Sequence, residues 1–286
     1  MSQTAAIQQE DTPRQIVWSG TGMAASDGAG VKLSRIIGQP QLPDLDPFLM
    51  LDAFGSDDPN AYIAGFPSHP HRGFETVTYM LAGRMRHRDN KGHEGLLTPG
   101  SVQWMTAGRG IVHSEMPEQD HGLMKGFQLW VNLPAKDKMT APRYQEIAPG
   151  QIPRVTLAEG VWAKVIAGEV LGVRGPVDPP ATEPLLVDLD MTGGAAAELI
   201  LPLTHTAFVY VYEGAARIGA RCLEAGMIGV LSTGNSLRLE AGPESTKVLV
   251  AAGKPLREPV AKYGPFVMNT EEELRQAVLD FRAGRF

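Results

Sequence analysis

The feature that most constrains the fold of this chain is the frequency with which glycine and proline interrupt its apolar runs. The 286 residues include 32 glycines and 22 prolines. Many of them separate short segments rich in Val, Thr, Ile, Leu and Tyr, with turn signals such as Ala82-Gly83 and Pro99-Gly100 between them. Short strands joined by frequent turns favour a β-sandwich or β-barrel, and the length allows two domains with sizeable cores.

Strand-like runs lie on both sides of a polar, proline-punctuated segment at about residues 134–153. Those before it are Gln15–Trp18, Val31–Ile37, Thr76–Leu81, Ser101–Met105, Ile111–Ser114 and Phe127–Leu133, and those after it are Val161–Ala167, Leu185–Leu189, Ala207–Tyr212 and Val248–Ala251. The segment predicts a domain boundary, which we place between residues 138 and 139. The first ~14 residues are expected to be disordered or loosely docked.

An internal repeat relates the two halves. Tyr79–Gly83 (YMLAG) matches Tyr210–Gly214 (YVYEG), and Gly100–Glu115 matches Gly226–Ala241 without a gap. Although the identity is low, two copies of one β-barrel unit would explain both the length and the density of turns.

One segment, at the C-terminal end, has a helical pattern. Thr270 and Glu273 form a capping-box pattern, and Gly284 would end the helix. An apolar face follows at helical spacing, made of Leu274, Ala277, Val278 and Phe281. We expect a short packing helix that closes a barrel.

Composition excludes several classes of protein. The net charge is −6 and no Lys/Arg-rich run interrupts the acidic background, so nucleic acid and anionic membranes are not expected as partners. Cys222 is the only cysteine, which excludes an internal disulfide and a thiolate metal site. Residues 1–11 lack the apolar core of a signal peptide, and no apolar stretch approaches membrane-spanning length. A cytoplasmic location is expected.

Two short motifs carry potential metal chemistry, His69–His71 (HPH) and His113–Glu115 (HSE). Because side chains alternate along a strand, residues two apart point the same way. Each motif therefore offers a ligand pair to one surface, while Pro70 and Ser114 would face away. Pro70 also suggests a strand start or an edge strand.

Two neighbouring strands of this kind would bring four ligands to one point. One His-x-His pair alone is weak evidence, but two such pairs in similar β contexts strengthen the prediction. The nitrogen and oxygen donors suit Fe(II), Mn, Ni, Cu or Zn rather than Ca or Mg, and a six-coordinate ion would keep about two positions open. The predicted ligands are His69, His71, His113 and Glu115.

The surroundings of both motifs closely resemble those of the pirin family, two-domain members of the cupin superfamily. The resemblance covers nearly all of the chain after about Ile16. It rests on Phe66–Tyr79 (FPSHPHRGFETVTY) and Gln103–Pro117 (QWMTAGRGIVHSEMP), with further support from Leu45–Gly55 and Gly264–Thr270. It implies an all-β fold of two cupin (jelly-roll-like) barrels, with one Fe(II)-type site in the N-terminal barrel held by the four residues above.

Glu75 departs from the general cupin pattern. Many cupins take their carboxylate ligand from the first motif, where Glu75 stands, whereas pirin-like proteins use the glutamate of the second motif, here Glu115. Glu75 could share the inner face of the barrel and act near the site or on substrate. An equally plausible role is a core-facing acid with a hydrogen-bonded partner.

The repeat predicts that the second barrel holds no metal. The alignment places Ile200, Pro202, Leu239 and Ala241 at the four ligand positions, and none of these side chains can bind an ion. It sets His205 opposite Phe74, away from any ligand position.

Other residues near the motifs carry weaker predictions. His87, His93 and His121 lie in polar, turn-rich sequence and are expected to be solvated. Arg72 would anchor a backbone carbonyl or an acidic side chain. The residues that either line a pocket or form core are Trp104, Met105, Phe127 and Trp130.

Two functions follow from the resemblance. The first is an oxygenase that cleaves a flavonol such as quercetin with O₂, in which Glu115 leaves the metal and accepts the substrate's hydroxyl proton. The second is an iron-dependent, redox-responsive regulator that binds transcriptional or metabolic partner proteins through the surface near Arg72 and Arg109. A structural metal protein is weaker, because the ligand shell is incomplete. A monomer is expected.

Overall fold

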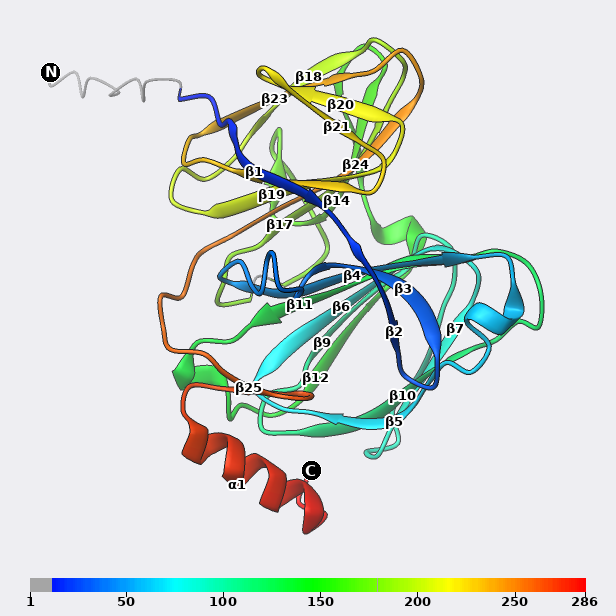
Figure 1. Cartoon of the computed structure of the whole chain (residues 1–286), viewed down its shortest axis with the longest axis vertical. Coiled ribbons are helices and arrows are strands. Elements are labelled where there is room, and N and C mark those ends of the chain that lie inside the picture. Colours follow the sequence, from blue (N-terminus) through cyan, green and yellow to red (C-terminus); the bar gives the residue numbers. More distant parts are fainter. Residues whose placement is uncertain (1–11, 179) are drawn as a thin grey trace, which may run out of the picture.

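The computed structural model describes residues 12–178 and 180–286, and the described residues form two β-barrels stacked on each other (Figure 1). Each barrel joins a seven-stranded and a four-stranded sheet. The large sheet of the first barrel has the order β12-β9-β6-β11-β4-β3-β2 and the small one β5-β10-β7-β8. The second barrel has β1-β22-β19-β24-β17-β14-β13 and β18-β23-β20-β21. The prediction of an all-β chain with two barrels is confirmed.

The strands of the first barrel are β2 (Met23–Asp27), β3 (Val31–Ile37), β4 (Phe48–Ser56), β5 (Phe66–His71), β6 (Phe74–Ala82), β7 (Met85–Asp89), β8 (Glu94–Leu97), β9 (Val102–Thr106), β10 (Ile111–Pro117), β11 (Met124–Asn132) and β12 (Arg143–Ile147). Those of the second are β1 (Ile16–Thr21), β13 (Arg154–Ala158), β14 (Val161–Ala167), β17 (Leu185–Met191), β18 (Ala196–Ile200), β19 (Thr206–Glu213), β20 (Ala215–Ile218), β21 (Arg221–Glu224), β22 (Met227–Leu231), β23 (Ser236–Ala241) and β24 (Thr246–Gly253). Two small hairpins, β15 (Glu169–Val170) with β16 (Val173–Arg174) and β25 (Ala261–Tyr263) with β26 (Phe266–Met268), three 3₁₀ turns (Pro59–Ala61, Ala135–Asp137, Pro149–Gln151) and α1 (Glu271–Arg282) complete the described chain.

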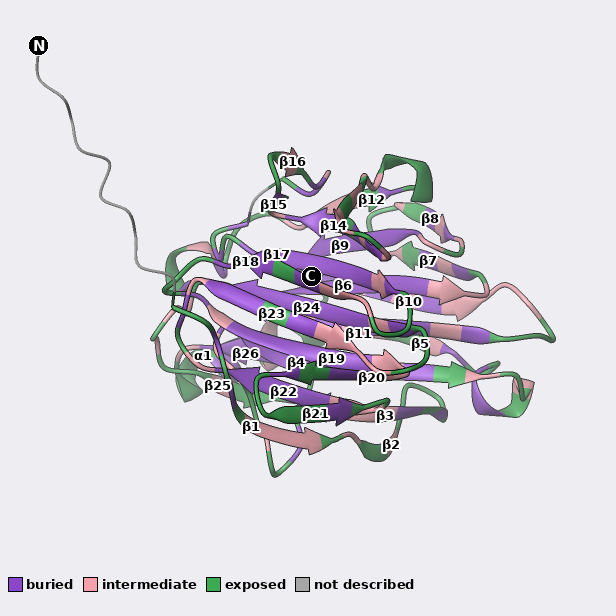
Figure 2. Ribbon diagram, turned by 90° about the horizontal axis from the view of Figure 1, so that it is seen from above, coloured by how far each residue is buried: buried purple, intermediate pink, exposed green. Residues whose placement is uncertain are grey.

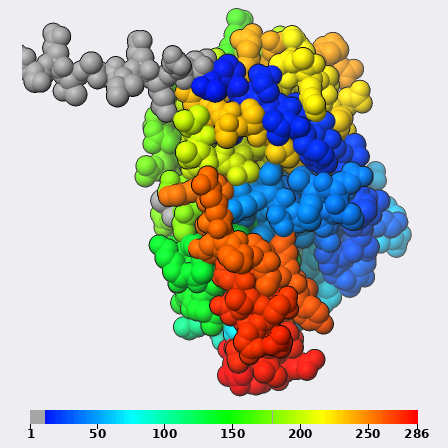
Figure 3. Space-filling model, turned by 60° about the vertical axis from the view of Figure 1, so that its left-hand side comes forward, coloured from blue at the N-terminus to red at the C-terminus, as the bar shows by residue number. Residues whose placement is uncertain are grey.

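Three segments depart from the predicted boundary between residues 138 and 139. β1 pairs with β22 of the second barrel although it precedes the first. β12, inside the predicted linker, pairs with β9 of the first barrel. α1 and the β25-β26 hairpin return to the first barrel, where a bridge joins Arg72 to Phe266. The boundary stays a proposal, but each barrel contains segments from the other side of it. Figure 3 shows the blue N-terminal segment against the yellow part of the second barrel and the orange-red C-terminal segment at the opposite end of the molecule.

The N-terminal prediction was too broad. Residues 1–11 lie outside the described part of the chain, whereas Arg14 is only 1% exposed. Its guanidinium donates to the carbonyl oxygens of Gly234, Pro202 and His205 at 2.7–2.9 Å. A buried guanidinium needs such acceptors, since leaving a buried charge unpaired is costly. The chain is thus anchored on the second barrel from about residue 14 onward.

The large sheets pack face to face and form the core between the barrels, and purple buried stretches run along their strands (Figure 2). The first sheet contributes Val77, Tyr79, Trp104 and Phe127, and the second contributes Phe208 and Tyr210 among others. Within this apolar layer the Tyr79 and Tyr212 hydroxyls donate to the buried Asp188 carboxylate at 2.6 and 2.5 Å. Trp104 and Phe127 therefore serve as core of this layer, and Met105 is buried in a separate cluster with Ala107 and Ile111, so none of the three lines a pocket.

The repeat is visible in the strand order. β6 lies between β9 and β11, and β19 lies between β22 and β24. Gly83 and Gly214 follow these central strands with positive φ angles of 83° and 68°, a conformation that glycine adopts without steric cost. The two halves are therefore copies of one barrel.

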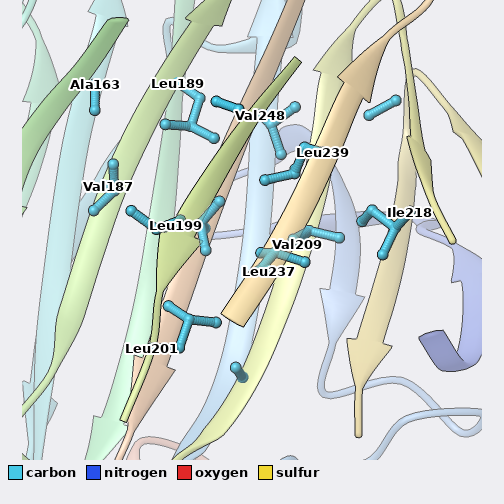
Figure 4. Packing of buried hydrophobic residues seen from close by; sticks show 14 of the residues in the cluster. Ala163, Val187, Leu189, Leu199, Leu201, Val209, Ile218, Leu237, Leu239 and Val248 are labelled. Carbon is cyan, nitrogen blue, oxygen red and sulfur yellow. The ribbon is translucent and has the colours of Figure 1, made fainter. Parts of the chain in front are cut away.

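The interior of the second barrel is filled with aliphatic side chains (Figure 4). Strand pairing corrects the predicted alignment, because Leu239 faces Ala197, and Leu237 faces Leu199. Ala197 and Leu199, rather than Ile200 and Pro202, thus stand where His69 and His71 stand in the first barrel. None of these side chains has an atom that can bind a metal ion. The absence of a metal from the second barrel stays a prediction.

Helix α1 closes against the first barrel, not the second. Thr270 and Glu273 form the predicted capping box. Leu274 and Ala277 are buried against the β25-β26 hairpin, together with Phe286. Arg72, next to His71, donates to Asp280 of the helix at 2.7 Å and to the Arg109 carbonyl at 2.6 Å. The predicted anchoring role of Arg72 is confirmed.

The Arg72–Asp280 pair predicts an acid-sensitive contribution to stability. The Arg72 guanidinium, followed by Arg285, lowers the pKa of Asp280 to about 2. A depressed carboxyl pKa means that the stabilisation is present above pH ~4 and is lost as the pH falls toward 2. We expect Asp280→Asn to lower the free energy of unfolding by about 1–2 kcal/mol at pH 7 and by less at pH 3, measured by urea denaturation. Glu272→Gln, on the exposed side of α1, should change it by less than about 0.5 kcal/mol; equal losses for both variants would contradict the assignment.

Candidate metal centre

Antiparallel pairing of β5 with β10 brings the two predicted ligand motifs together. His69 lies directly opposite His113, and His71 lies opposite Ile111. β5 is an edge strand of its sheet, as Pro70 predicted. Along β10 the side chains alternate, with His113 and Glu115 buried and Ser114 less so. Cross-strand neighbours on one face lie about 5 Å apart, so the register itself gathers the imidazoles.

The three histidines form a compact cluster. Candidate donor atoms of His69, His71 and His113 all lie within 4.8 Å of one another. The imidazole centroids are 4.7 Å apart for His69 and His71, 4.4 Å for His69 and His113, and 4.9 Å for His71 and His113. Three of the four predicted ligands are thus brought together, and they could hold a metal ion.

The free nitrogens of the cluster fit a metal. Nδ1 of His71 and Nε2 of His113 are buried and have no hydrogen-bond partner among the described residues. Nδ1 of His69 lies 2.8 Å from the Pro67 carbonyl oxygen, which can only accept, so Nδ1 donates its proton there. Nε2 is then the nitrogen of His69 that can bind a metal. Buried polar atoms without partners are rare, and a cation shared by the three imidazoles would give the orphaned nitrogens of His71 and His113 a partner.

Burial keeps two of these imidazoles neutral. It is the main cause that lowers the pKa of His71 and of His113 well below the usual value, and the neighbouring imidazoles lower both further. A neutral imidazole is the form that binds metals. His71 and His113 are therefore in the form that binds an ion at neutral pH.

Glu115 lies beside the cluster but outside the compact group of three. Its Oε1 is 2.9 Å from the Thr78 hydroxyl, and its Oε2 accepts from Nε2 of Gln128 at 3.0 Å. The Thr78 hydroxyl is also 2.7 Å from Oε1 of Gln128, so its single proton serves one of the two acceptors at a time. Burial raises the pKa of Glu115, while His69, Thr78 and Gln128 act in the opposite direction. Its role as fourth ligand stays a proposal.

Glu75 does not share the interior of the barrel. It lies two residues from Val77 on β6 and so faces the layer between the barrels, whereas Thr78 faces Glu115. Its carboxylate accepts from the Thr106 hydroxyl at 2.6 Å. The turn at Arg72–Gly73 separates β5 from β6, so the in–out alternation of side chains does not continue from His71 to Glu75. Counting residues along the sequence therefore predicted the wrong face for Glu75. The alternative prediction, a core-facing acid with a hydrogen-bonded partner, describes it correctly.

His87 is the functional candidate that the sequence argument missed. It was expected in solvent but is fully buried on β7, and its Nδ1 lies 3.4 Å from Nδ1 of His113. His93 is partly exposed, stacks on Tyr144 and contacts Glu146 at 3.0 Å, while His121 is exposed as predicted. The sequence did contain a sign of this role. His87 and Asp89 are two residues apart, the same spacing as in the two ligand motifs.

A cavity of about 620 Å³ opens beside the cluster. Its wall includes His69, His71, Glu115, Gln128 and Trp130. Trp130 also packs edge-on against His71, with 5.3 Å between the ring centroids, and its ring is tilted by 36° against that of Phe74 at 4.3 Å. Of the four residues predicted as pocket or core, Trp130 is the one that lines this cavity. The volume suits a small organic ligand.

Comparison with known proteins decides the family. The pirin family model matches residues 30–131 and the pirin C-terminal cupin domain matches residues 186–286. This chain belongs to the pirin family. A Pseudomonas aeruginosa pirin relative, named "Putative quercetin 2,3-dioxygenase", is 53% identical over 95% of this chain and 97% of its own length. Human pirin is 46% identical over 90% of this chain and 88% of its own.

The pirin fold also matches solved structures. A crystal structure of quercetin 2,3-dioxygenase from Acinetobacter baumannii superimposes with a TM-score of 0.90 at 37% identity, covering 96% of this chain and 99% of that one. The bicupin architecture is therefore shown. Among the described residues of this pirin, no helix is long and apolar enough to cross a membrane.

Removing one imidazole should abolish metal binding. We expect wild-type protein to bind about one equivalent of divalent metal and His113→Ala to retain less than about a tenth of it, because two neutral imidazoles bind far more weakly than three. Elemental analysis after dialysis measures this. The control is His121→Ala, whose side chain is 89% exposed. Full occupancy in His113→Ala would show that the cluster is not the site.

Loss of the His87 contact should weaken the site without destroying it. Nδ1 of His87 lies 3.4 Å from Nδ1 of His113, and outer contacts of this kind are worth about 10- to 100-fold in metal affinity. We expect His87→Phe to keep one-to-one binding with an affinity lower by that factor, measured by competition with a chelator. His93→Phe, one step farther out, should change the affinity less than threefold; the reverse order would contradict the role of His87.

Proposed function

We propose that this protein is a metal-dependent dioxygenase that cleaves a flavonol such as quercetin with O₂. The observation that carries the proposal is the opening of the three-histidine cluster onto a cavity that has aromatic side chains in its wall and a carboxylate at its side. A structural metal site would be closed by protein ligands, whereas a catalytic site keeps positions open. The names of the relatives from P. aeruginosa and A. baumannii support the same reaction.

The proposed ligands are His69, His71, His113 and Glu115, and the proposed ion is Fe(II). Mn, Ni, Cu and Zn suit the same nitrogen and oxygen donors. When bound, the ion would supply Lewis-acid stabilisation of negative charge on the substrate oxygens and a meeting point for substrate and O₂. Three imidazoles from two strands hold this position rigidly, because both strands are fixed by sheet hydrogen bonds.

The protein's own acid–base group would be Glu115. Burial raises its pKa, which brings a carboxylate closer to the basicity needed to accept the hydroxyl proton of a flavonol. Gln128 and Thr78 hold its two oxygens and would keep it aimed at the substrate. Trp130 and Phe54 provide an apolar wall on which the flat rings can pack.

The regulatory hypothesis loses one of its supports. It placed a partner-binding surface near Arg72 and Arg109, but Arg72 is only 3% exposed and is held by Asp280 and the Arg109 carbonyl. It could influence a partner only through α1, so the oxygenase is favoured. The cytoplasmic location, the monomeric state and the absence of nucleic-acid partners stay predictions.

Glu115 and Glu75 offer a matched test, since both are buried glutamates but only Glu115 lies at the cavity. With Fe(II)-loaded protein, we expect Glu115→Gln to lower kcat for quercetin-dependent O₂ uptake by about 100-fold or more per bound metal, because the proton acceptor is lost. Glu75→Gln should change it less than threefold. O₂ consumption measured with an electrode decides the matter. If wild type consumes no more O₂ than His69→Ala, the enzymatic proposal fails.

A further inference from the structure

A row of polar side chains extends from Glu115 across the floor of the cavity. Thr78 on β6 lies opposite Gln128 on β11, Gln128 lies opposite Asp52 on β4, and Asp52 lies opposite Arg35 on β3. Directly opposite residues share one face of a sheet. Two strand spacings place Arg35 about 10 Å from Gln128. This is roughly the span of a three-ring flavonol.

The far end of the row is a preorganised cluster of three charges, Asp27, Arg35 and Asp52. Arg35 donates to both oxygens of Asp52 at 2.9 and 2.7 Å and to Asp27 at 2.8 Å. Its Nη1 has no acceptor among the described residues, which leaves two N–H groups available. All three residues line the cavity that contains His69 and His71. Side-chain exposure falls from 51% for Asp27 to 24% for Arg35 and 3% for Asp52.

The cavity between the two ends is apolar. Met50 and Phe54 flank Asp52 on the same face of β4, and Leu33 flanks Arg35 on β3. Trp130 and Phe66 line the cavity as well. A ligand that fits must therefore be apolar in its middle and polar at both ends.

The charges at the two ends differ in sign. Two carboxylates against one guanidinium give the Asp27–Arg35–Asp52 cluster a net charge of −1. At the other end, a divalent cation beside one carboxylate would carry a net positive charge. Such a cavity favours a ligand whose anionic oxygens sit at the histidines and whose far end donates hydrogen bonds without carrying negative charge.

We propose that the Asp27–Arg35–Asp52 cluster is the subsite for the hydroxylated ring of the substrate. It selects neutral phenols, whose hydroxyl groups donate to Asp27 and accept from Arg35, over aromatic acids with a carboxylate at the same place. Asp27 is the residue that determines specificity, because its side chain is the most exposed of the three, whereas Asp52 is buried and both of its oxygens accept from Arg35. This inference rests on the proposed flavonol function. It goes beyond that function by naming the part of the substrate that the protein recognises, the hydroxylated outer ring.

The test compares three ligands of one shape. Quercetin carries hydroxyl groups on its outer ring, galangin is the same flavonol without them, and a 3-hydroxyflavone with an outer-ring carboxylate carries the disfavoured charge. Binding is measured by fluorescence titration of Zn(II)-loaded protein under argon, so that no turnover is needed. The variants are Asp27→Asn, which keeps the side-chain shape, and Asp57→Asn, an exposed aspartate outside the cavity, as control.

We expect Asp27→Asn to weaken quercetin binding about tenfold, the effect of losing one hydrogen bond to a charged group. Galangin binding should change less than twofold, and the carboxylated flavonol should bind more tightly to Asp27→Asn than to wild type. Asp57→Asn should match wild type with all three. With Fe(II)-loaded protein, the KM for quercetin should rise while kcat changes less than twofold.

The outcomes separate the two proposals. If galangin binds wild type no better than His69→Ala, the chelating end is wrong and the flavonol function fails. Galangin binding can depend on His69 even if the subsite proposal is wrong. In that case Asp27→Asn would weaken the binding of quercetin and galangin equally, or would weaken neither, and the flavonol function would stand without the subsite. Unchanged thermal unfolding of Asp27→Asn excludes a folding defect as the cause of a loss.

Discussion

The direct pairing of His69 with His113 is the contact on which the functional organisation of this pirin depends. Backbone hydrogen bonds between β5 and β10 set that register. A slip of β5 by one residue would turn His69 and His71 out of the barrel, since β10 stays paired with β7. Three imidazoles in so small a space cannot all be protonated, and burial depresses the pKa of two of them. The sheet thus holds neutral nitrogen donors in place at a cost that a bound cation would offset.

The two barrels show what the same scaffold does with and without such a site. In the second barrel, Leu199, Leu237 and Leu239 fill the interior, and it is a closed aliphatic core. The first barrel instead contains histidines, a polar row and a cavity of about 620 Å³. The first barrel has fewer apolar contacts in its interior, but its large sheet packs on the second barrel through an extensive apolar layer. Within that layer Asp188 accepts hydrogen bonds from the hydroxyls of Tyr79 and Tyr212. The second barrel, with its filled interior, thus stabilises the first barrel from outside.

Exchange of terminal segments ties the metal centre to the rest of the chain. β1 adds a strand to the second barrel, and α1 returns to cover the first. Arg72 follows His71 directly and reaches Asp280 on α1, while the ring of Phe286 lies 4.4 Å from its guanidinium. The strand that carries His69 and His71 is therefore held from outside by Asp280, 208 positions away from Arg72 in the sequence.

The sequence by itself determined the architecture and the three histidines of the site. Turn spacing, the repeat and the i, i+2 alternation of ligand types can be identified in the sequence without knowledge of the fold. Two of the predicted strands, Val31–Ile37 and Val161–Ala167, have the predicted bounds. Tertiary structure alone decided which face Glu75 occupies, because the turn at Arg72–Gly73 resets the alternation. It also decided that His87 lies beside His113, that Ala197 rather than Ile200 stands at the position of His69, and that α1 packs on the first barrel. These last three depend on contacts between segments far apart in the sequence, and a local pattern contains no information about its partner.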